Sequence, residues 1–390
     1  MSGAALMLTA HPPGTGSGSA VRGAVTLGAL RGLYERVDVL SFAFESEGRF
    51  ALPGVTLVPR PPLPSTVEQL TALRYGSGYY HPERAAGLVG VVREHVAAGR
   101  LSPEYELVWC HGSLMARAGA VLGAQRRVLD IDNIAQEAVR QTIDDQPSGP
   151  VRRAYRRLGM HAVGHEERRR CAPQDVVFVT SETERGLLGR VRPPVVVLPN
   201  TVPDPGPPAR GLAPSPTVLF VGSLDYGPNV DAVAWLAGEI VPALRSADQG
   251  VRVVIAGRRP TEAVRDAVAQ SGMELVESPA TLSPLYQQAH VVLAPLRTGG
   301  GTGRIKILEA MAHGAAIVAT PQGVAGLAPG DVAAVAIGDG TEELAATIRS
   351  LLSDGDRAER LGAAARETWR SRHGPEVAQR VIAETLGDRR

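Results

Sequence analysis

Short apolar runs rich in valine and isoleucine alternate with longer amphipathic stretches along nearly the whole chain. In the first half these runs predict strands at residues 4–9, 37–44, 55–59, 107–110, 127–131, 176–180 and 195–198. In the second half they predict strands at 218–221, 251–256, 274–276, 291–294, 316–319 and 332–337. Apolar strands separated by helices are typical of βαβ units, whose parallel sheet is buried on both faces. The pattern therefore predicts an α/β fold in each half.

A proline-rich segment separates the two halves. Residues 199–216 contain seven prolines and no hydrophobic period, so they predict a linker rather than a helix or strand. A length of 390 residues also suits two domains better than one. We expect an N-terminal Rossmann-like domain at 1–200, the linker at 201–216, a C-terminal Rossmann-like domain at 217–374, and a final helix at 375–390 that packs back on the first domain.

Composition narrows the class of protein. Hydrophobic residues make up 44% of the chain and charged residues 21%, so we expect sizeable hydrophobic cores. The net charge is +1, which lacks the basic excess of a general nucleic-acid-binding protein. No run reaches the 18 apolar residues of a membrane-spanning helix, and the first residues make a poor signal peptide. Two cysteines, Cys110 and Cys171, fit packing roles in a reducing compartment. We expect a cytoplasmic protein.

Two glycine-rich loops follow predicted strands, one in each half. They span residues 14–22 and 299–304. Ligands of parallel sheets bind beyond the carboxyl ends of the strands, where the amides at helix N-termini attract phosphate. Loops of this kind on two domains predict a nucleotide-type ligand in a cleft between the domains.

The second loop continues into a longer motif. Residues 301–320 read GTGRIKILEAMAHGAAIVAT and closely resemble the donor-site signature of the large group 1 family of retaining glycosyltransferases. Gly222 with Ser223, the run 254–257 and Leu285 with Tyr286 align with the same family in the expected order. The similarity covers most of the second half and is weaker in the first. It implies the GT-B fold, in which two Rossmann-like domains face an interdomain cleft.

The resemblance also implies roles for individual residues. The glutamate at the position of Glu309 accepts hydrogen bonds from the ribose hydroxyls of the nucleotide, and Lys306 shares a helix face with Glu309. The full set of expected donor-binding residues is Gly16, Gly18, Gly222, Ser223, Gly257, Arg258, Gly301, Thr302, Gly303, Arg304, Ile305, Lys306 and Glu309.

The sequence departs from the family pattern in two places. Many members carry a second glutamate eight positions before Glu309, where this chain has Gly301. Members also place an arginine and a lysine after the first strand of the donor domain, where this chain has Ser223 and the Pro228-Asn229 pair. Arg304 and Lys306, the only lysine of the chain, are the expected replacements for the phosphate cations and the expected catalytic residues.

Residues of the first half are candidates for the acceptor side: Arg22, His111, Asp132 and Asn133. His111 follows a strand, so it is expected to contact donor or acceptor, or else only to flank a helix. Asp130-Ile131-Asp132 mimics a DxD metal motif, with acceptor contact or helix capping as the alternatives. We expect no metal site.

Two further patterns carry competing interpretations. Gly16-Ser17-Gly18 with Glu45 imitates a dinucleotide fingerprint, but Val21 stands where the third glycine belongs. The arginine-rich stretch at 152–170 indicates a solvated helix face, with peripheral contact to anionic lipid as the lesser alternative.

Taken together, the sequence predicts a metal-independent retaining glycosyltransferase of the hexosyltransferase type. Its donor would be a nucleotide diphosphate sugar, its acceptor a small molecule, a glycan or a lipid-linked sugar, and no cofactor or nucleic acid is expected. A nucleotide-sugar epimerase of the same fold and a non-catalytic nucleotide-sugar-binding partner stay open as alternatives. The sequence does not identify the sugar, the base, the acceptor or a general base.

Overall fold

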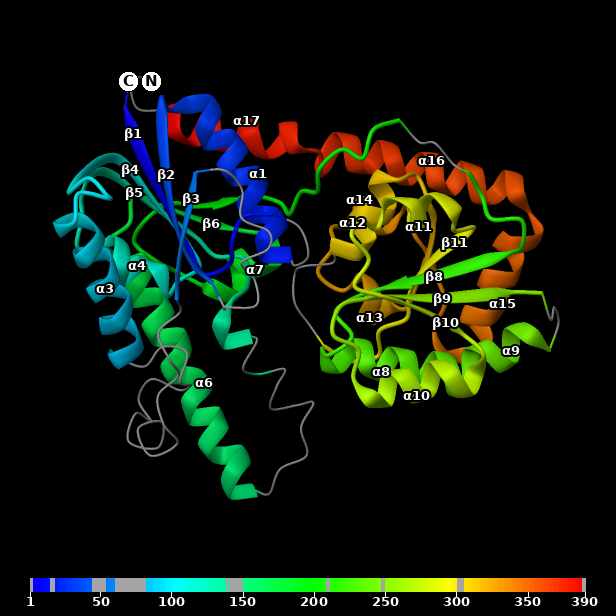
Figure 1. The fold of residues 1–390 in the computed structure, drawn as a ribbon. Coiled ribbons are helices and arrows are strands. Elements are labelled where there is room, and N and C mark those ends of the chain that lie inside the picture. The colour runs from blue at the N-terminus through cyan, green and yellow to red at the C-terminus, as the bar shows by residue number, and fades with distance from the viewer. Residues whose placement is uncertain are drawn as a thin grey trace. The chain divides into compact units, whose positions relative to one another are not determined.

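A computed structural model describes residues 3–14, 18–43, 54–59, 82–137, 140, 150–207, 211–246, 250–299 and 305–387 (Figure 1). The chain divides into two compact units. Unit 1 comprises Met1–Asn200 together with Ala378–Arg390, and unit 2 comprises Thr201–Val377.

The described residues of unit 1 form a seven-stranded parallel sheet with the order β3-β2-β1-β4-β5-β6-β7. The strands are β1 Ala4–Thr9, β2 Arg36–Ala43, β3 Val55–Pro59, β4 Glu104–His111, β5 Gly123–Asp130, β6 Val176–Val179 and β7 Val195–Val197. The chain enters at β1 in the middle, winds outward to β3, and then winds the other way from β4. The boundary between β1 and β4 is therefore the switch point of unit 1, where loops from the two strands diverge.

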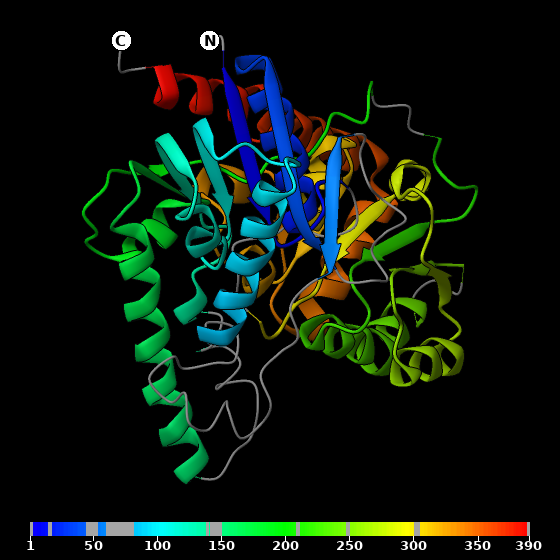
Figure 2. The same cartoon turned by 60° about the vertical axis from the view of Figure 1, so that its left-hand side comes forward.

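Helices cover both faces of this sheet. They are α1 Gly18–Leu33, α3 Pro82–Ala97, α4 Met115–Gly119, α6 Pro150–Cys171, α7 Glu182–Leu188 and α17 Pro375–Gly387. Side chains alternate across each strand, so Leu6 and Leu8 pack with α3, α4 and α6 on one face (Figure 2). Met7 and Trp109 pack with α1 and α17 on the other face, where Trp109 also stacks on Phe178. This two-sided burial is the reason that the strands are continuous apolar runs.

Helix α17 returns the chain to unit 1. Ala378, Ile382 and Leu386 are spaced by four residues, lie on one helix face and enter the core beside α1. The guanidinium of Arg126 donates to the carbonyl oxygens of Leu386 and of Thr385, the latter at 3.3 Å. These bonds satisfy carbonyls in the last turn of α17.

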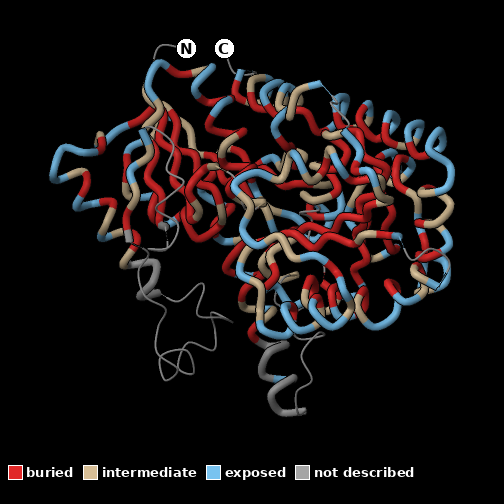
Figure 3. The backbone as a smooth tube through the Cα atoms, turned by 45° about the vertical axis from the view of Figure 1, so that its right-hand side comes forward, coloured by how far each residue is buried: buried red, intermediate tan, exposed pale blue. Residues whose placement is uncertain are grey.

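Unit 2 contains a six-stranded parallel sheet in the order β10-β9-β8-β11-β12-β13. The strands are β8 Thr217–Val221, β9 Arg252–Gly257, β10 Glu274–Glu277, β11 Val291–Ala294, β12 Ala316–Ala319 and β13 Ala336–Ile337. This is again the doubly wound order, and its switch point lies between β8 and β11. The central strands of both units are buried, as the red segments of the tube show (Figure 3).

The helices of unit 2 lie on both sides of its sheet. They are α8 Gly227–Trp235, α9 Val241–Arg245, α10 Glu262–Ser271, α11 Ser283–Gln288, α12 Ile305–Ala312, α13 Pro321–Val324, α14 Pro329–Val332, α15 Gly340–Ser353 and α16 Gly355–Arg372. A π-helical stretch at Leu236–Ile240 joins α8 to α9. Valines and leucines of β8, β9 and β11 pack against α8, α10 and α15 in one core.

The predicted α/β class with a parallel sheet in each half is confirmed. One predicted strand, 332–337, is wrong over most of its length: α14 ends at Val332, and only Ala336–Ile337 form β13. Pro329 at the first position of α14 and the Asp331 carboxylate, which accepts from the Ala328 amide at 3.1 Å, begin a helix there. A short apolar run does not distinguish a helical turn from a strand.

The described parts of the proline-rich segment 201–216 form neither helix nor strand. Its first residues are held by α16. The Val202 amide donates to the His373 carbonyl at 3.2 Å, and the Arg366 guanidinium bonds the Asp204 carboxylate at 2.7 Å and the Gly206 carbonyl at 3.0 Å. Thr201 to Gly206 are thus attached to unit 2. Among the described helices, none is both long and apolar enough to cross a membrane.

Candidate functional site

The loops that follow β8 and β9 in unit 2 approach each other closely. A Cβ atom on Gly257 would lie 1.7 Å from the Gly222 carbonyl oxygen, and one on Gly222 would lie 2.6 Å from the Asn229 amide nitrogen. Such separations exclude any side chain, so both glycines are required by the packing of the loops. Their expected contact with a donor stays a prediction.

Asn229, in the first turn of α8, joins the two sides of the switch point of unit 2. Its side chain is 5% exposed. The Nδ2 group donates to the Ser223 carbonyl at 2.9 Å, and Oδ1 accepts from Lys306 Nζ at 2.8 Å. Asn229 therefore connects the loop after β8 to α12, the helix that follows β11.

Lys306 lies in the first turn of α12. Its ammonium group stands 4.3 Å from the centre of the Phe220 ring, which comes from β8, in a cation–π arrangement. The ring and the Asn229 amide hold the ammonium at the carboxyl ends of β8 and β11. Because helix N-termini and cations both attract anions, this position favours a phosphate group.

Glu309 lies one turn after Lys306 and is partly buried. Its carboxylate accepts from the Tyr286 hydroxyl at 2.9 Å. Burial raises the pKa of Glu309, while the bond from Tyr286 and the charge of Lys306 act in the opposite direction. The Tyr286 ring stacks on His313 with their centres 4.8 Å apart. Glu309 is thus fixed by an aromatic pair behind it.

His313 follows the last turn of α12. Its Nδ1 lies 2.7 Å from the Glu309 carbonyl oxygen and its Nε2 lies 2.9 Å from the Ser283 hydroxyl. Burial lowers the pKa of His313. A neutral imidazole that donates from Nδ1 and accepts at Nε2 satisfies both contacts.

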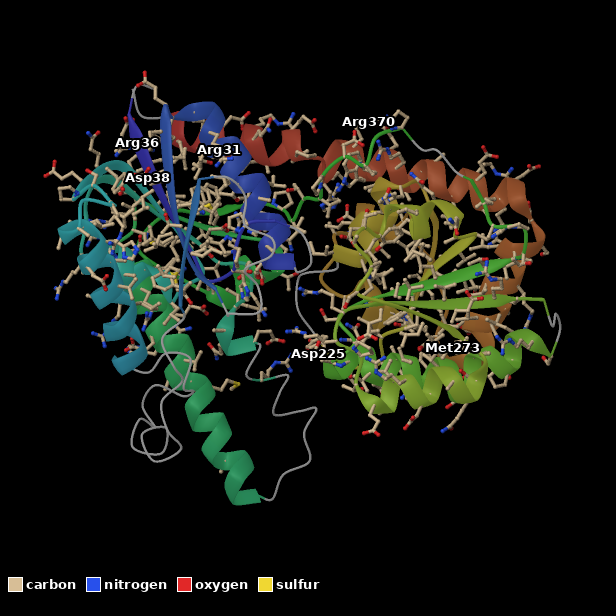
Figure 4. All side chains as sticks on the ribbon, viewed as in Figure 1. Arg31, Arg36, Asp38, Asp225, Met273 and Arg370 are labelled. Atoms are coloured by element: carbon tan, nitrogen blue, oxygen red, sulfur yellow. The ribbon has the colours of Figure 1, made fainter. Side chains whose placement is uncertain are left out.

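Arg258, another predicted donor residue, follows β9, and its expected contact with a donor stays a prediction. The Arg258 carbonyl accepts from the Leu224 amide at 2.8 Å, which ties the loop after β9 to the loop after β8. The neighbouring Arg259, at a positive φ of 53°, pairs with Asp225 at 2.9 Å. Figure 4 shows Asp225 at the end of unit 2 where α8 begins.

The glycine-rich loops are described only in part. Gly299, at φ 80°, packs against Pro228, because a Cβ there would lie 2.5 Å from the proline Cγ atom. Ile305 begins α12, and Gly18 begins α1. The predicted residues Gly16, Gly301, Thr302, Gly303 and Arg304 lie outside the described residues.

In unit 1 the loops at the switch point hold a buried charge cluster. His111, at the end of β4, places Nδ1 3.1 Å from an Asp130 carboxylate oxygen. The Arg22 guanidinium bonds both oxygens of Asp130, with its shortest contact at 2.5 Å. Arg22 also donates to the Leu198 carbonyl at 2.8 Å and to Asn200 at 3.2 Å. Arg22 is 2% exposed, so its main partners are protein groups; its contact with an acceptor stays a prediction.

Asp132 completes the cluster. Its carboxylate lies 3.5 Å from His111 Nε2 and accepts from the Ser19 hydroxyl of α1. Its side chain is 25% exposed, whereas those of Asp130 and His111 are at most 2% exposed. Asp132 is therefore the member of the cluster with the most access to solvent.

The charges of the cluster set the pKa values of its members. Burial disfavours a charged His111, but hydrogen bonds and charge from Asp130 and Asp132 prevail and raise the His111 pKa to about 9. Burial would raise the pKa of each carboxyl group, but Arg22 and His111 lower that of Asp130, and His111, Ser19 and Arg22 lower that of Asp132. At neutral pH the cluster contains a protonated histidine between two carboxylates.

The cluster changes the interpretation of the DxD pattern. The Asp130 carboxylate is wholly buried and bonded to Arg22 and His111, so the two aspartates do not form an open pair for a cation. Among the described residues, no group of three or more potential ligands could hold a metal ion.

Asn133 is exposed, and the backbone amides after it bond to acidic side chains from elsewhere. The Ala135 amide donates to Glu167 of α6 at 3.1 Å, and the Ile134 amide donates to Glu184 of α7 at 3.4 Å. Glu184 also accepts from the Thr180 hydroxyl at 2.6 Å. These two buried glutamates fix the loop after β5 that carries Asp132.

Sequence reasoning missed several of these residues. Asn229 and Tyr286 lie in segments that resemble the family, and Phe220 lies in a predicted strand, but the sequence predicts no contact for any of them. Asp130 is predicted only as half of a possible metal motif. A usable signal exists for Asn229, because the Pro228-Asn229 pair stands where the resembled family has a cation, while the only lysine of the chain lies elsewhere. No local signal pointed to Glu167 and Glu184.

Residues 215–354 match the family described as Glycosyl transferases group 1. No curated protein sequence matches the chain significantly.

Solved structures resemble the chain over nearly its full length. HepE of Anabaena, crystallised with UDP and glucose, has a TM-score of 0.66 at 15% identity, with 98% of this chain and 99% of that one covered. Sucrose-phosphate synthase of Thermosynechococcus elongatus has a TM-score of 0.66 at 16% identity and 98% coverage of each chain. TarM of S. aureus, in a complex that includes UDP, has a TM-score of 0.67 at 10% identity, with coverages of 98% and 99%.

The similar solved structures show the fold of the chain, which is GT-B with two Rossmann-like domains. Residues 215–354 form a group 1 glycosyl transferase domain, which confirms the resemblance seen in the sequence.

Proposed function

We propose that this protein transfers a sugar from a nucleoside diphosphate sugar to an acceptor hydroxyl with retention of the anomeric configuration. The observation that carries the proposal is the Lys306 ammonium at the switch point of unit 2, with Glu309 one turn further along α12. A cation and a carboxylate at this spacing suit a diphosphate and a ribose of one nucleotide. The similar structures crystallised with UDP support the same ligand class.

In the proposed complex, unit 2 binds the nucleotide. The Glu309 carboxylate accepts hydrogen bonds from the two ribose hydroxyls, and Tyr286 keeps it oriented by donating to one oxygen. Lys306 faces the diphosphate, and Arg304 of the same motif is proposed to assist it. Charge that grows on the departing phosphate is stabilised by these cations and by the amides of α12.

The reaction breaks the bond between the anomeric carbon and the phosphate oxygen, and a bond forms between that carbon and the acceptor oxygen. The acceptor proton passes to the departing phosphate, so a nucleoside diphosphate and a glycoside are the products. Retention follows from the family resemblance and requires attack from the face that the phosphate leaves. Positioning and electrostatic stabilisation supply the catalysis, so the proposed step needs no metal or cofactor.

We assign the acceptor to unit 1. Asp132 is the partly exposed member of a cluster whose other charges are buried, and a carboxylate accepts hydrogen bonds from sugar hydroxyls. His111, Asp130 and Arg22 would hold Asp132 in place. His111 is also a candidate for direct contact with donor or acceptor.

The test incubates the purified protein with UDP-, GDP- and ADP-linked sugars and measures nucleoside diphosphate release, with and without a panel of sugar and lipid-linked acceptors. Acceptor-dependent release with an α-linked product from an α-linked donor supports the proposal. Conversion of the donor without any acceptor indicates the epimerase alternative. Nucleotide binding without turnover over the whole panel indicates a binding partner and contradicts the proposal.

A further inference from the structure

The side chain of Asn229 has a fixed orientation. Its Nδ2 group faces the Ser223 carbonyl, which only accepts hydrogen bonds, and its Oδ1 atom faces the Lys306 ammonium, which only donates. Reversing the amide would place like groups together at both ends. The backbone supports this arrangement, since the Asn229 amide itself donates to the Tyr226 carbonyl at 2.9 Å.

Lys306 needs such a partner. A lysine side chain has four flexible carbons and loses conformational entropy when it is held in one position. Asn229 and the Phe220 ring restrain the ammonium from two directions, at 2.8 Å and 4.3 Å. Both of these partners are uncharged, and the charge of the ammonium also acts on the Glu309 carboxylate one turn along α12.

We infer that Asn229 is a positioning residue that sets the Lys306 ammonium for the diphosphate of the donor. This inference rests on the proposed function. Asn229 acts through Lys306 and makes no contact with substrate of its own. The lysine belongs to α12, yet the bond to Asn229 brings its charge to the first turn of α8, on the other side of the switch point.

The test is a double-mutant cycle in the full-length protein with Asn229→Ala, Lys306→Ala and the double variant. Calorimetry measures the affinity of whichever of UDP, GDP or ADP binds the wild type most tightly, and competition measures the affinity of the matching nucleoside. The control is Asp231→Ala: Asp231 lies in α8, the same helix as Asn229, and the change removes its exposed ion pair with Arg297.

We expect Asn229→Ala to weaken diphosphate binding about tenfold, the scale of a hydrogen bond to a charged group, and to leave nucleoside binding unchanged. In the Lys306→Ala background the same change should have no further effect, because the group through which Asn229 acts is gone. The control should bind like the wild type.

Three results would overturn the inference. The first is an unchanged diphosphate affinity in Asn229→Ala, and the second is a loss of nucleoside affinity as large as the loss of diphosphate affinity. The third is that Asn229→Ala weakens diphosphate binding as much in the Lys306→Ala background as in the wild type. The last two indicate a merely structural asparagine. If Asn229→Ala does not fold, Asn229→Ser is carried through the same cycle under the same criteria. A wild type that binds none of the three diphosphates contradicts the proposed function itself, which distinguishes the two failures.

Discussion

Both units hold cations at the carboxyl ends of the central strands of a doubly wound sheet, but the neighbours of those cations differ. In unit 1, Arg22 and His111 lie against the carboxylates of Asp130 and Asp132. In unit 2, the Lys306 ammonium is oriented by an asparagine amide and an aromatic ring. The same topology therefore presents two cations against two carboxylates in one unit. In the other it presents a cation that an amide and an aromatic ring orient, with the Glu309 carboxylate one turn away.

This difference indicates a division of labour between the two switch points. Carboxylates that neutralise buried cations leave little net positive potential to attract an anion. They do accept hydrogen bonds from hydroxyl groups. At Lys306 the Asn229 amide and the Phe220 ring orient the ammonium without adding negative charge, which favours the binding of phosphate. We therefore assign the anionic donor to unit 2 and the neutral acceptor to unit 1.

The largest effect is expected from breaking the cluster of unit 1. Asp130→Asn leaves Arg22 and His111 buried without their shared carboxylate, which should lower the free energy of unfolding by about 3 to 5 kcal/mol. Urea unfolding followed by circular dichroism measures this. The matched change Asp231→Asn, at an exposed ion pair, should cost about 1 kcal/mol or less. Equal effects of the two changes would refute the claim that the cluster is structurally essential.

In unit 2 the same kind of change should affect catalysis instead. Lys306→Ala removes the cation nearest the proposed phosphate, so turnover should fall about 100-fold or more, the scale seen when one oriented charge-stabilising donor is lost. The affinity for the donor should fall less, because the phosphate gains charge only in the transition state. Steady-state kinetics separates the two effects. An undiminished turnover would remove Lys306 from the mechanism.

The cluster of unit 1 also predicts a dependence of stability on pH. The pKa of His111 is raised to about 9, so its protonation stabilises the fold fully below about pH 6.5, and this contribution is lost as the pH rises through 9. At about 1.4 kcal/mol per pKa unit, the expected loss is about 3 kcal/mol. Urea unfolding at several pH values should show this decline in the wild type and a flatter profile in His111→Gln. Parallel profiles would show that His111 is not held protonated.

The smallest expected effect separates stability from function in unit 2. Burial raises the pKa of Glu309, so its charged form costs stability above the ordinary carboxyl pKa and not below it. Glu309→Gln keeps an acceptor for Tyr286 without the charge, and should raise the melting temperature at pH 7 by about 2 °C. The same variant should bind nucleotide more weakly, by about 1.5 kcal/mol. If Glu309→Gln raised both the melting temperature and the nucleotide affinity, or lowered both, the assignment of Glu309 to nucleotide binding would be contradicted.

The sequence was sufficient for the fold because burial on both faces makes each parallel strand a continuous apolar run. Met7, Trp109 and Phe178, on β1, β4 and β6, show why: they lie in one apolar core on the same face of the sheet. The prediction was wrong at 332–337, where Pro329 and Asp331 begin a helical turn that an apolar run does not exclude.

Only those residues of the candidate site that lie together in one sequence motif could be predicted. Lys306 and Glu309 stand in one motif, so their positions on α12 could be predicted. The bond of Lys306 to Asn229 spans 77 residues, and that of Arg22 to Asp130 spans 108. Pairings of this kind depend on which strands become neighbours and leave no periodic signal in either segment. The interdomain cleft and the roles of Gly16 and residues 301–304 stay predictions.

The most direct test of the account is hydrogen exchange of the full-length protein with and without a saturating nucleoside diphosphate. We predict slower exchange in the loops after β8 and β9 and in the first turn of α12, at residues 222–229, 257–259 and 305–309. The loops of unit 1 around His111 and Asp132 should change little until an acceptor is added. Protection centred on the unit 1 cluster, with unit 2 unchanged, would contradict the assignment of the donor to unit 2.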